Sequence, residues 1–277
     1  MTFSGTVELL DNRDLGSGNF LAAFDAPEIA GEIRPAQFVM VRVREGSDPL
    51  LGRPLSVAGV GSGSHGSTLE LLYKVVGRGT DLLAGLRPGA RVGMVGPLGR
   101  PFPDPPRNAG PIFMVAGGIG IAPFPYLARE LLRQERSLTL IYGARGAGDL
   151  IGLELFPAER LETRLATDDG SAGHHGLVTE ILEKELAALP PGERSRSVSY
   201  VCGPTAMMAT ADAVLQRHQA AGHFSVEAFM GCGFGVCLSC VIPVKDASGR
   251  VQGYRRTCVD GPTFPAGTIH WPGSVSP

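Results

Sequence analysis

The chain has 277 residues, 43% of them hydrophobic, with 25 Lys and Arg against 27 Asp and Glu. This length and apolar content allow about two domains with cores of their own. The net charge of −2 argues against a basic surface for nucleic acid or an anionic membrane. The N-terminal segment is acidic and lacks a basic-then-apolar signal pattern, so we expect a cytoplasmic protein.

The first hundred residues predict short β-strands. Runs of alternating or β-branched residues, separated by glycine-rich turns, lie at residues 6–12, 19–26, 37–45, 55–60 and 68–76. Strands of this length and spacing are typical of a small antiparallel barrel. Five prolines among residues 101–111 then indicate a linker.

After the linker, strand-like and helix-like segments alternate. The strand-like runs lie at residues 112–116, 138–144, 162–167 and 198–203, and the helix-like segments at 122–135, 177–189 and 205–219. This alternation predicts a doubly wound parallel sheet. The apolar stretch 110–128 is long enough for a membrane span, but its glycines and prolines favour a strand, a turn and a helix start.

These patterns divide the chain into three predicted domains. Residues 1–104 form an antiparallel β-barrel, residues 108–224 a nucleotide-binding α/β domain, and residues 225–277 a small domain that carries a cysteine-rich loop. The predicted fold class is therefore a multidomain β and α/β protein.

The loop GCGFGVCLSC holds Cys232, Cys237 and Cys240, and Cys258 follows it. The resulting spacing, C-x4-C-x2-C-x17-C, is that of a plant-type [2Fe–2S] cluster, whereas zinc ribbons use two separated pairs. Three alternating glycines allow the loop to turn its backbone N–H groups toward the sulfides. A structural zinc ion and free buried thiols are the alternatives.

Two elements of the predicted barrel are suited to phosphate. Arg53, in the sequence RPLS, can pair bidentately with a pyrophosphate, and a nearby hydroxyl or backbone N–H can face a flavin ring. The sequence GRGTD, residues 77–81, is a glycine turn that leads into a helix N-terminus, where anions bind. A surface arginine and an ordinary helix cap are the alternatives, but the two elements together favour a nucleotide.

A second glycine turn follows the strand at 112–116. Gly117, Gly118 and Gly120 allow a dinucleotide pyrophosphate to approach the backbone at the start of a helix. Pro123 stands where the G-x-G-x-x-G fingerprint has its third glycine, so the turn departs from that fingerprint.

Cys202 ends a predicted strand at the edge where open α/β sheets bind ligands. Its alternative role is that of a small buried core residue. The sequence does not single out an acidic residue for a ribose 2′-hydroxyl, for which Asp149 and Glu154 are both candidates.

A barrel with RPLS and GRGT, followed by GGIGIAP and CGP, resembles the ferredoxin–NADP reductase superfamily. The C-terminal sequences FMGCGFGVCLSC and RRTCVDGPTF narrow this resemblance to the electron-transfer subunit of class B dihydroorotate dehydrogenase. The resemblance extends over essentially the whole chain.

The resemblance implies site residues. It implies that the four cysteines hold a [2Fe–2S] cluster and that FAD is contacted by Arg53, Pro54, Leu55, Ser56, Leu72, Tyr73, Lys74, Gly79 and Thr80. In the wider superfamily an aromatic residue usually precedes the motif serine and stacks on the flavin. Leu55 stands in that place here, which leaves open what covers that face of the ring.

The resemblance also implies a function. A partner subunit with FMN would oxidise dihydroorotate to orotate in pyrimidine biosynthesis, in a heterotetramer of two copies of each subunit. Electrons would pass singly through the cluster to FAD, which can then donate a hydride to NAD⁺. One alternative is a reductase subunit of another dehydrogenase or a hydrogenase. An alternative from another class is a nucleotide-sensing module with a zinc-stapled loop.

Overall fold

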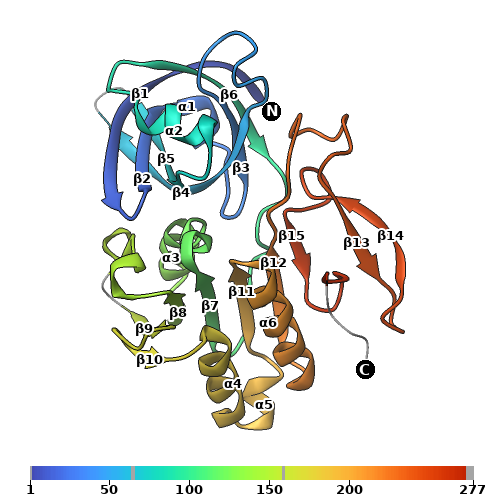
Figure 1. Cartoon of the computed structure of the whole chain (residues 1–277). Helices are drawn as coiled ribbons and strands as arrows, with labels where there is room; N and C mark the ends of the chain where they lie inside the picture. The colour runs from blue at the N-terminus through green and yellow to red at the C-terminus, as the bar shows by residue number, and fades with distance from the viewer. Residues whose placement is uncertain (1, 64–65, 158–159, 273–277) are drawn as a thin grey trace.

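The computed structural model describes residues 2–63, 66–157 and 160–272. Three regions follow one another along the chain: a barrel, an α/β domain beneath it and a C-terminal region at the side of both (Figure 1). In the part of the chain that the structure describes, no helix combines the length and the apolar character needed to cross a membrane.

The N-terminal region is the predicted antiparallel barrel. Its strands close in the order β1-β2-β5-β4-β3-β6. They are β1 (Phe3–Gly16), β2 (Asn19–Asp25), β3 (Phe38–Arg42), β4 (Arg53–Gly63), β5 (Gly66–Lys74) and β6 (Arg91–Leu98). Short helices α1 (Pro27–Ala30) and α2 (Arg78–Ala84) lie between strands. Inward-facing residues such as Leu9, Phe24, Val41 and Leu71 are buried in one barrel core.

Strand β6 closes the barrel and was not among the five predicted runs. Two glycines and a proline interrupt its sequence RVGMVGPL, and these residues usually indicate a turn. The strand nevertheless pairs with β1 and β3 on its two sides. Gly96 is required by the close packing here, because a Cβ atom would lie 2.6 Å from Cγ1 of Val39.

The second region is the predicted doubly wound sheet, with strand order β10-β9-β8-β7-β11-β12-β15. Its parallel strands are β7 (Ile112–Gly117), β8 (Leu138–Ala144), β9 (Leu161–Thr167), β10 (His174–His175), β11 (Val198–Cys202) and β12 (Ala221–Ser225). Strand β12 was not predicted. Strand β15 (Thr263–Pro265) comes from the predicted third domain and completes the sheet by antiparallel pairing with β12.

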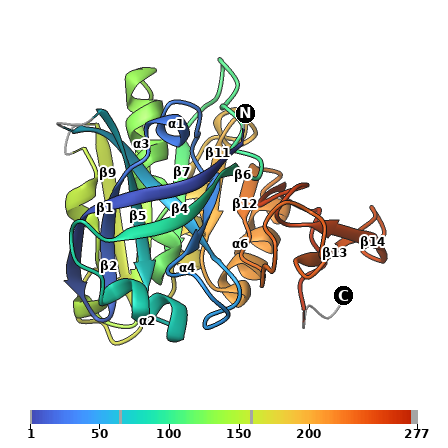
Figure 2. The same cartoon turned by 90° about the horizontal axis from the view of Figure 1, so that it is seen from above.

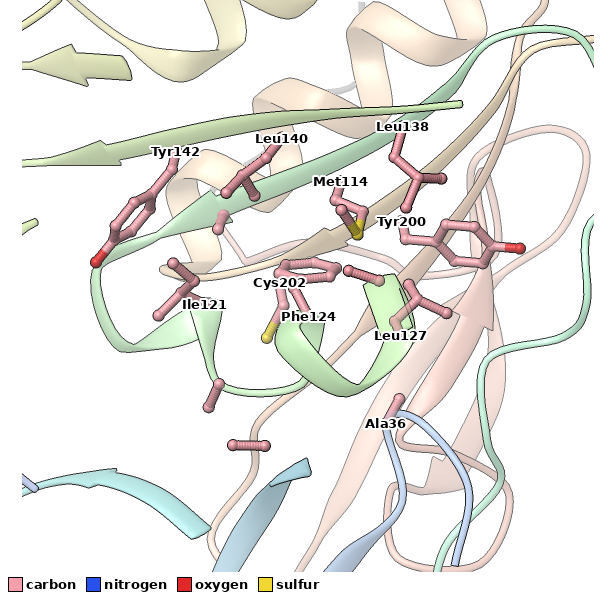
Figure 3. Close-up of a cluster of buried hydrophobic side chains, with 14 of the residues drawn as sticks. Ala36, Met114, Ile121, Phe124, Leu127, Leu138, Leu140, Tyr142, Tyr200 and Cys202 are labelled. Atoms are coloured by element: carbon pink, nitrogen blue, oxygen red, sulfur yellow. The ribbon is translucent and has the colours of Figure 1, made fainter. Parts of the chain in front are cut away.

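Helices cover both faces of this sheet. Helix α3 (Phe124–Arg133) lies between the sheet and the barrel, where Phe124 and Leu127 pack with Met114 and Tyr200 (Figure 3). Helices α4 (Val178–Ala188) and α6 (Thr205–Arg217) pack on the opposite face. Helix α3 is also tied to the barrel by an ion pair, in which Nη1 of Arg129 lies 3.2 Å from Oε2 of Glu70. The barrel and the α/β domain are therefore joined at α3 by apolar packing and by an ion pair.

The C-terminal region contains the hairpin of β13 (Val241–Lys245) and β14 (Val251–Arg256). Seen from above, the hairpin projects away from the barrel and the sheet (Figure 2). Its base is buried against the barrel, where Cys240 and Cys258 pack with Phe38, Met40 and Leu98. This contact places the cysteine loop beside β3 and β6.

Candidate functional site

The four predicted ligand cysteines lie together at the edge of the barrel. Cys240 and Cys258 are both buried, and their sulfur atoms are 3.2 Å apart. Cys232 is close enough to Cys237 to hydrogen-bond to its sulfur, and Cys237 is exposed. The ligands are thus arranged as a buried pair and an outer pair, as two iron atoms with two thiolates each require.

The two pairs differ in electrostatics. Hydrogen bonds, first from the Ser239 hydroxyl, lower the pKa of Cys237 to about 6. Burial, followed by the neighbouring Cys240, raises the pKa of Cys258 to about 12. A thiolate is the form that binds metal, so the lowered pKa of Cys237 favours its binding form, whereas the raised pKa of Cys258 means that this buried thiol loses its proton only when a metal is bound.

The backbone around the cysteines fits an iron–sulfur cluster. Gly233 and Gly235 have φ values of +85° and +89°, which side chains rarely adopt. A Cβ atom at Gly235 would lie 2.6 Å from Cγ2 of Val259, so the loop has no room for a larger residue there. The hydroxyl of Thr257 is buried beside Cys258 without a hydrogen-bond partner, which leaves a donor available. In the described residues, no group of three or more His, Cys, Asp or Glu side chains is positioned to hold a metal ion.

The two phosphate-ready elements of the barrel meet in space. Arg53 begins β4, and its guanidinium group lies directly against the backbone of Gly79 at the start of α2. A side-chain carbon at Gly79 would overlap with that guanidinium group. Thr80 accepts hydrogen bonds from the backbone N–H groups of Val76 and Gly77 at 3.0 and 3.2 Å, which fixes the turn. The arginine and the helix N-terminus therefore form one cradle suited to a pyrophosphate.

The other residues of the predicted flavin site divide between two faces of the barrel wall. Ser56 and Pro54 are partly exposed, whereas Leu55 is 8% exposed and belongs to the barrel core. The ring of Tyr73 is also in that core, where it stacks on Phe20 and its hydroxyl lies 3.1 Å from Oδ1 of Asn12. Burial raises the pKa of Tyr73 to about 12. Any contact of Tyr73 with a flavin would therefore come from its backbone.

A cavity of about 470 Å³ lies between the barrel and the carboxyl edge of the parallel sheet. Lys74 and Asn19 line it from the barrel, and Gly117 and Gly118 line it from the glycine turn. Gly118 has open space around it and a φ of +52°, as a close approach of a ligand to the backbone requires. A larger cavity of about 740 Å³ at the opposite edge of the sheet contains none of the predicted residues.

Two predicted residues of this site are buried behind the cavity. A Cβ atom at Gly120 would overlap with the carbonyl oxygen of Cys202, so Gly120 serves close packing of the turn on β11. Cys202 is buried, and burial, followed by the nearby carboxylate of Glu227, raises the pKa of its thiol far above the ordinary value. Cys202 is therefore a neutral thiol in the core between barrel and sheet (Figure 3).

The charged residues of the cavity include one candidate from the sequence and two residues that the sequence analysis missed. Of the two candidates for a ribose hydroxyl, Asp149 lines the cavity, whereas Glu154 forms an ion pair with Arg13 at 3.9 Å. Asp168, directly after β9, and Arg145, directly after β8, line it as well. Both residues directly follow strands of the predicted sheet. Because ligands bind at the carboxyl ends of such strands, the sequence could have indicated these two residues.

Family models match two parts of the chain. Residues 227–270 match the iron–sulfur cluster binding domain of dihydroorotate dehydrogenase B, and residues 114–213 match an oxidoreductase NAD-binding domain. The C-terminal region is thus an iron–sulfur domain, and the α/β region binds NAD.

Solved structures extend the match to the barrel. The structure of an NADH-dependent reduced ferredoxin–NADP oxidoreductase is 28% identical, with a TM-score of 0.81, and the match covers 96% of this chain and 90% of that one. A ferredoxin–NADP⁺ reductase from Neisseria gonorrhoeae, at 19% identity and a TM-score of 0.64, shares the fold over 78% of this chain and 91% of its own. The fold and the cysteine site define an oxidoreductase of the ferredoxin-reductase type with an added iron–sulfur domain.

Curated relatives identify the family. The dihydroorotate dehydrogenase B (NAD⁺) electron transfer subunit of Desulforamulus reducens is 39% identical over 90% of this chain and 91% of its own length. The corresponding subunit of Geobacillus thermodenitrificans is 36% identical over 95% of this chain and 97% of its own. The chain belongs to the family of dihydroorotate dehydrogenase B electron transfer subunits.

Proposed function

We propose that this subunit connects a dihydroorotate-oxidising partner subunit, which contains FMN, to NAD⁺. The resident groups would be a [2Fe–2S] cluster, which exchanges single electrons, and FAD, which also transfers hydride. The relatives' names supply the partner's substrate. The protein's own contribution is to hold these groups close together and in order.

One observation carries this proposal: the cysteine loop packs on the strand that neighbours the flavin segment. Gly233 approaches Met40 of β3 so closely that a Cβ atom would lie 2.5 Å from Cγ of that side chain. In the sheet, Met40 is paired with Pro54 of the RPLS segment on β4, and Phe38 with Ser56. The loop predicted to hold the cluster therefore packs on the strand next to the predicted flavin segment, which supports electron transfer between the two groups.

The proposed roles of the site residues follow from their positions. Arg53 and the α2 turn with Gly79 and Thr80 would bind the FAD pyrophosphate. Pro54, Ser56 and Lys74 would contact the flavin from the partly exposed side of the wall, and the backbones of Leu55, Leu72 and Tyr73 would complete it. The turn at Gly117 and Gly118 would bind NAD with its nicotinamide toward the barrel.

The cysteine loop also carries the proposed partner surface. Four apolar side chains near the ligands are exposed: Phe229 at 94%, Phe234 at 57%, Val236 at 75% and Leu238 at 56%. Apolar residues gathered at this density are typical of the centre of a protein interface. We propose that the catalytic partner covers them, in an assembly with two copies of each subunit.

The compartment is part of the same proposal. None of the five cysteines forms a disulfide. A cysteine-rich loop without disulfides is expected in the reducing cytoplasm, where we place this protein.

A second candidate function is a reductase subunit that serves another partner. The 28% identity and the TM-score of 0.81 with the NADH-dependent ferredoxin–NADP oxidoreductase structure favour it. The two functions share the cofactors and differ in the electron donor.

The test is co-purification of the native complex, followed by an assay of dihydroorotate-dependent NAD⁺ reduction. We expect a partner subunit with FMN and activity that requires both subunits. Leu238→Asp should weaken the complex on size exclusion and leave dye reduction by NADH unchanged. Val251→Asp is the matched control, since Val251 is 45% exposed at the far end of the hairpin from Cys240. A complex that reduces NAD⁺ with another donor only would contradict the proposed substrate.

A further inference from the structure

Ser239 lies between two ligand cysteines, in the sequence Cys237-Leu238-Ser239-Cys240. Its hydroxyl oxygen is 3.2 Å from the sulfur of Cys237. The backbone N–H of Gly231 donates a hydrogen bond to the same oxygen, at 2.9 Å. The carbonyl oxygen of Phe229 lies at 3.5 Å. The hydroxyl is therefore held at a ligand sulfur by a second, independent hydrogen bond.

The direction of the hydrogen bond to sulfur follows from the donors and acceptors present. The Gly231 N–H occupies a lone pair of the hydroxyl oxygen, so the hydroxyl hydrogen remains free to be donated. A metal-bound cysteine sulfur is a thiolate, which only accepts. It is also negatively charged and nearer than the Phe229 carbonyl, which makes it the better acceptor.

We propose that the Ser239 hydroxyl donates a hydrogen bond to the Cys237 sulfur of the cluster and raises the reduction potential of the cluster. Reduction adds one negative charge to the group that includes this sulfur. A fixed donor stabilises the added charge more than it stabilises the oxidised state, so the potential rises. The inference rests on the cysteine loop as a cluster site and does not require dihydroorotate as the substrate.

The Ser239 hydroxyl lies beside the outer pair of ligand cysteines and not beside the buried pair. Cys240 and Cys258 lie among the apolar side chains of Phe38, Met40 and Leu98. Cys237 and Ser239 are exposed instead, next to the proposed partner surface. The side-chain hydrogen bond that shifts the reduction potential is thus made to the outer pair of ligands.

Gly231 positions the donor. A Cβ atom at this residue would lie 3.1 Å from the Cys237 sulfur and 3.4 Å from the Ser239 hydroxyl oxygen. The contact with the sulfur is tighter than most real Cβ contacts, whereas the contact with the hydroxyl oxygen is at van der Waals distance, so an alanine would push the sulfur away from the hydroxyl. Its φ is not in the left-handed region, so the substitution would act through this crowding and not through backbone strain.

The test measures the reduction potential of the cluster in the isolated subunit, by a redox titration followed by electron paramagnetic resonance. Ser239→Ala should bind wild-type amounts of iron and sulfide. Its potential should fall, with a shift near tenfold in the reduction equilibrium, or about 59 mV for one electron. Ser239→Thr keeps the hydroxyl and should restore the potential. Ser248→Ala is the matched control, since that hydroxyl bonds Asp246 in the hairpin turn and should leave the potential unchanged.

An iron-loaded Ser239→Ala subunit with the wild-type potential would overturn the proposal. If that variant holds no iron, Gly231→Ala decides, because it keeps the Ser239 hydroxyl and crowds the Cys237 sulfur away from it. A lowered potential in Gly231→Ala, with a normal one in Ser239→Thr, supports the role, and an unchanged potential in Gly231→Ala overturns it. Since no partner or substrate is present, this outcome is independent of the dihydroorotate assay. A wild-type subunit that binds no iron would instead contradict the cluster site itself.

Discussion

The barrel and the α/β domain differ from the iron–sulfur region in how they are held together. Each of the first two contains a large apolar core within its own strands and helices. The iron–sulfur region buries its cysteines against Phe38, Met40 and Leu98 of the barrel. It buries Phe264, Ile269 and Trp271 against the α/β domain. It has little core of its own, so its stability depends on its metal and on anchors to its neighbours.

One anchor is a buried carboxylate on α6. Asp212 is 2% exposed and accepts hydrogen bonds from the backbone N–H of Gly267 at 2.7 Å and from Nε1 of Trp271 at 2.8 Å. Nζ of Lys245 on β13 lies 3.7 Å from the same side chain. Helix α6 begins just after Cys202, so this anchor also fixes the iron–sulfur hairpin relative to the cavity at the carboxyl edge of the sheet.

The largest expected effect is the loss of the iron–sulfur cluster without loss of FAD. Cys258→Ser should abolish cluster binding, because it removes a buried ligand, and should leave FAD bound in the barrel. Iron and sulfide analysis together with the flavin absorbance measures both. Cys202→Ser is the control and should retain full iron, since Cys202 lies in the core between barrel and sheet. Iron loss in the control would show that the ligand set is wrong.

The second prediction removes the anchor. Asp212→Ala should destabilise the iron–sulfur region by about 3–5 kcal/mol, because it leaves buried donors and a lysine without their acceptor. Denaturant unfolding, followed by cluster absorbance and separately by flavin fluorescence, should show earlier loss of the cluster. Asp212→Asn keeps an acceptor oxygen and should lose less. Equal shifts of both signals would mean that the regions unfold as one unit.

The third prediction concerns the barrel cradle. Arg53→Ala should weaken FAD binding by about 1.5–3 kcal/mol, the value of a charge-assisted hydrogen bond. Flavin retained after dialysis, measured by absorbance, tests it, with exposed Arg91 on β6 as the control for charge. Unchanged flavin occupancy in Arg53→Ala would exclude the cradle as the pyrophosphate site.

The smallest effect concerns thiol reactivity in protein stripped of iron. Because the pKa of Cys237 is lowered to about 6, its thiolate should dominate at pH 7.5 and react quickly with iodoacetamide. The rate should fall as the pH drops through 6, since the thiolate is then protonated. Cys202, whose pKa burial raises, should stay unmodified. Mass spectrometry locates the label, and faster labelling of Cys202 would contradict these environments.

Local patterns predicted much of this molecule. Alternating apolar residues in short runs indicated the barrel, and alternating strand-like and helix-like segments indicated the parallel sheet. The cysteine spacing indicated the iron–sulfur loop. For Tyr73, the family resemblance predicted a flavin contact but could not predict which side of the strand the side chain faces. Successive residues of a strand face opposite sides, so Leu72 packs between the domains while the Tyr73 ring enters the barrel core.

The contacts that sequence patterns could not predict are long-range. Strand β15 joins a sheet that begins 151 residues earlier in the chain, at Ile112. In the sequence, Asp212 is an ordinary acidic residue of a predicted helix. Its contacts with Trp271 and Lys245 form only in the folded chain. The bond from Ser239 to Cys237 is local, but its direction depends on Gly231, which the loop returns to the same place.

If FAD lies in the barrel cradle beside the cysteine loop, the iron–sulfur cluster should exchange electrons with NAD only through that flavin. The most direct measurement is an anaerobic titration of the isolated subunit with NADH, followed by flavin absorbance and by electron paramagnetic resonance of the cluster. We predict that NADH reduces both groups in the intact subunit and only the flavin in Cys258→Ser. In protein stripped of FAD, the cluster should stay oxidised. Reduction of the cluster by NADH in the flavin-free subunit would show that electrons reach the cluster without the flavin.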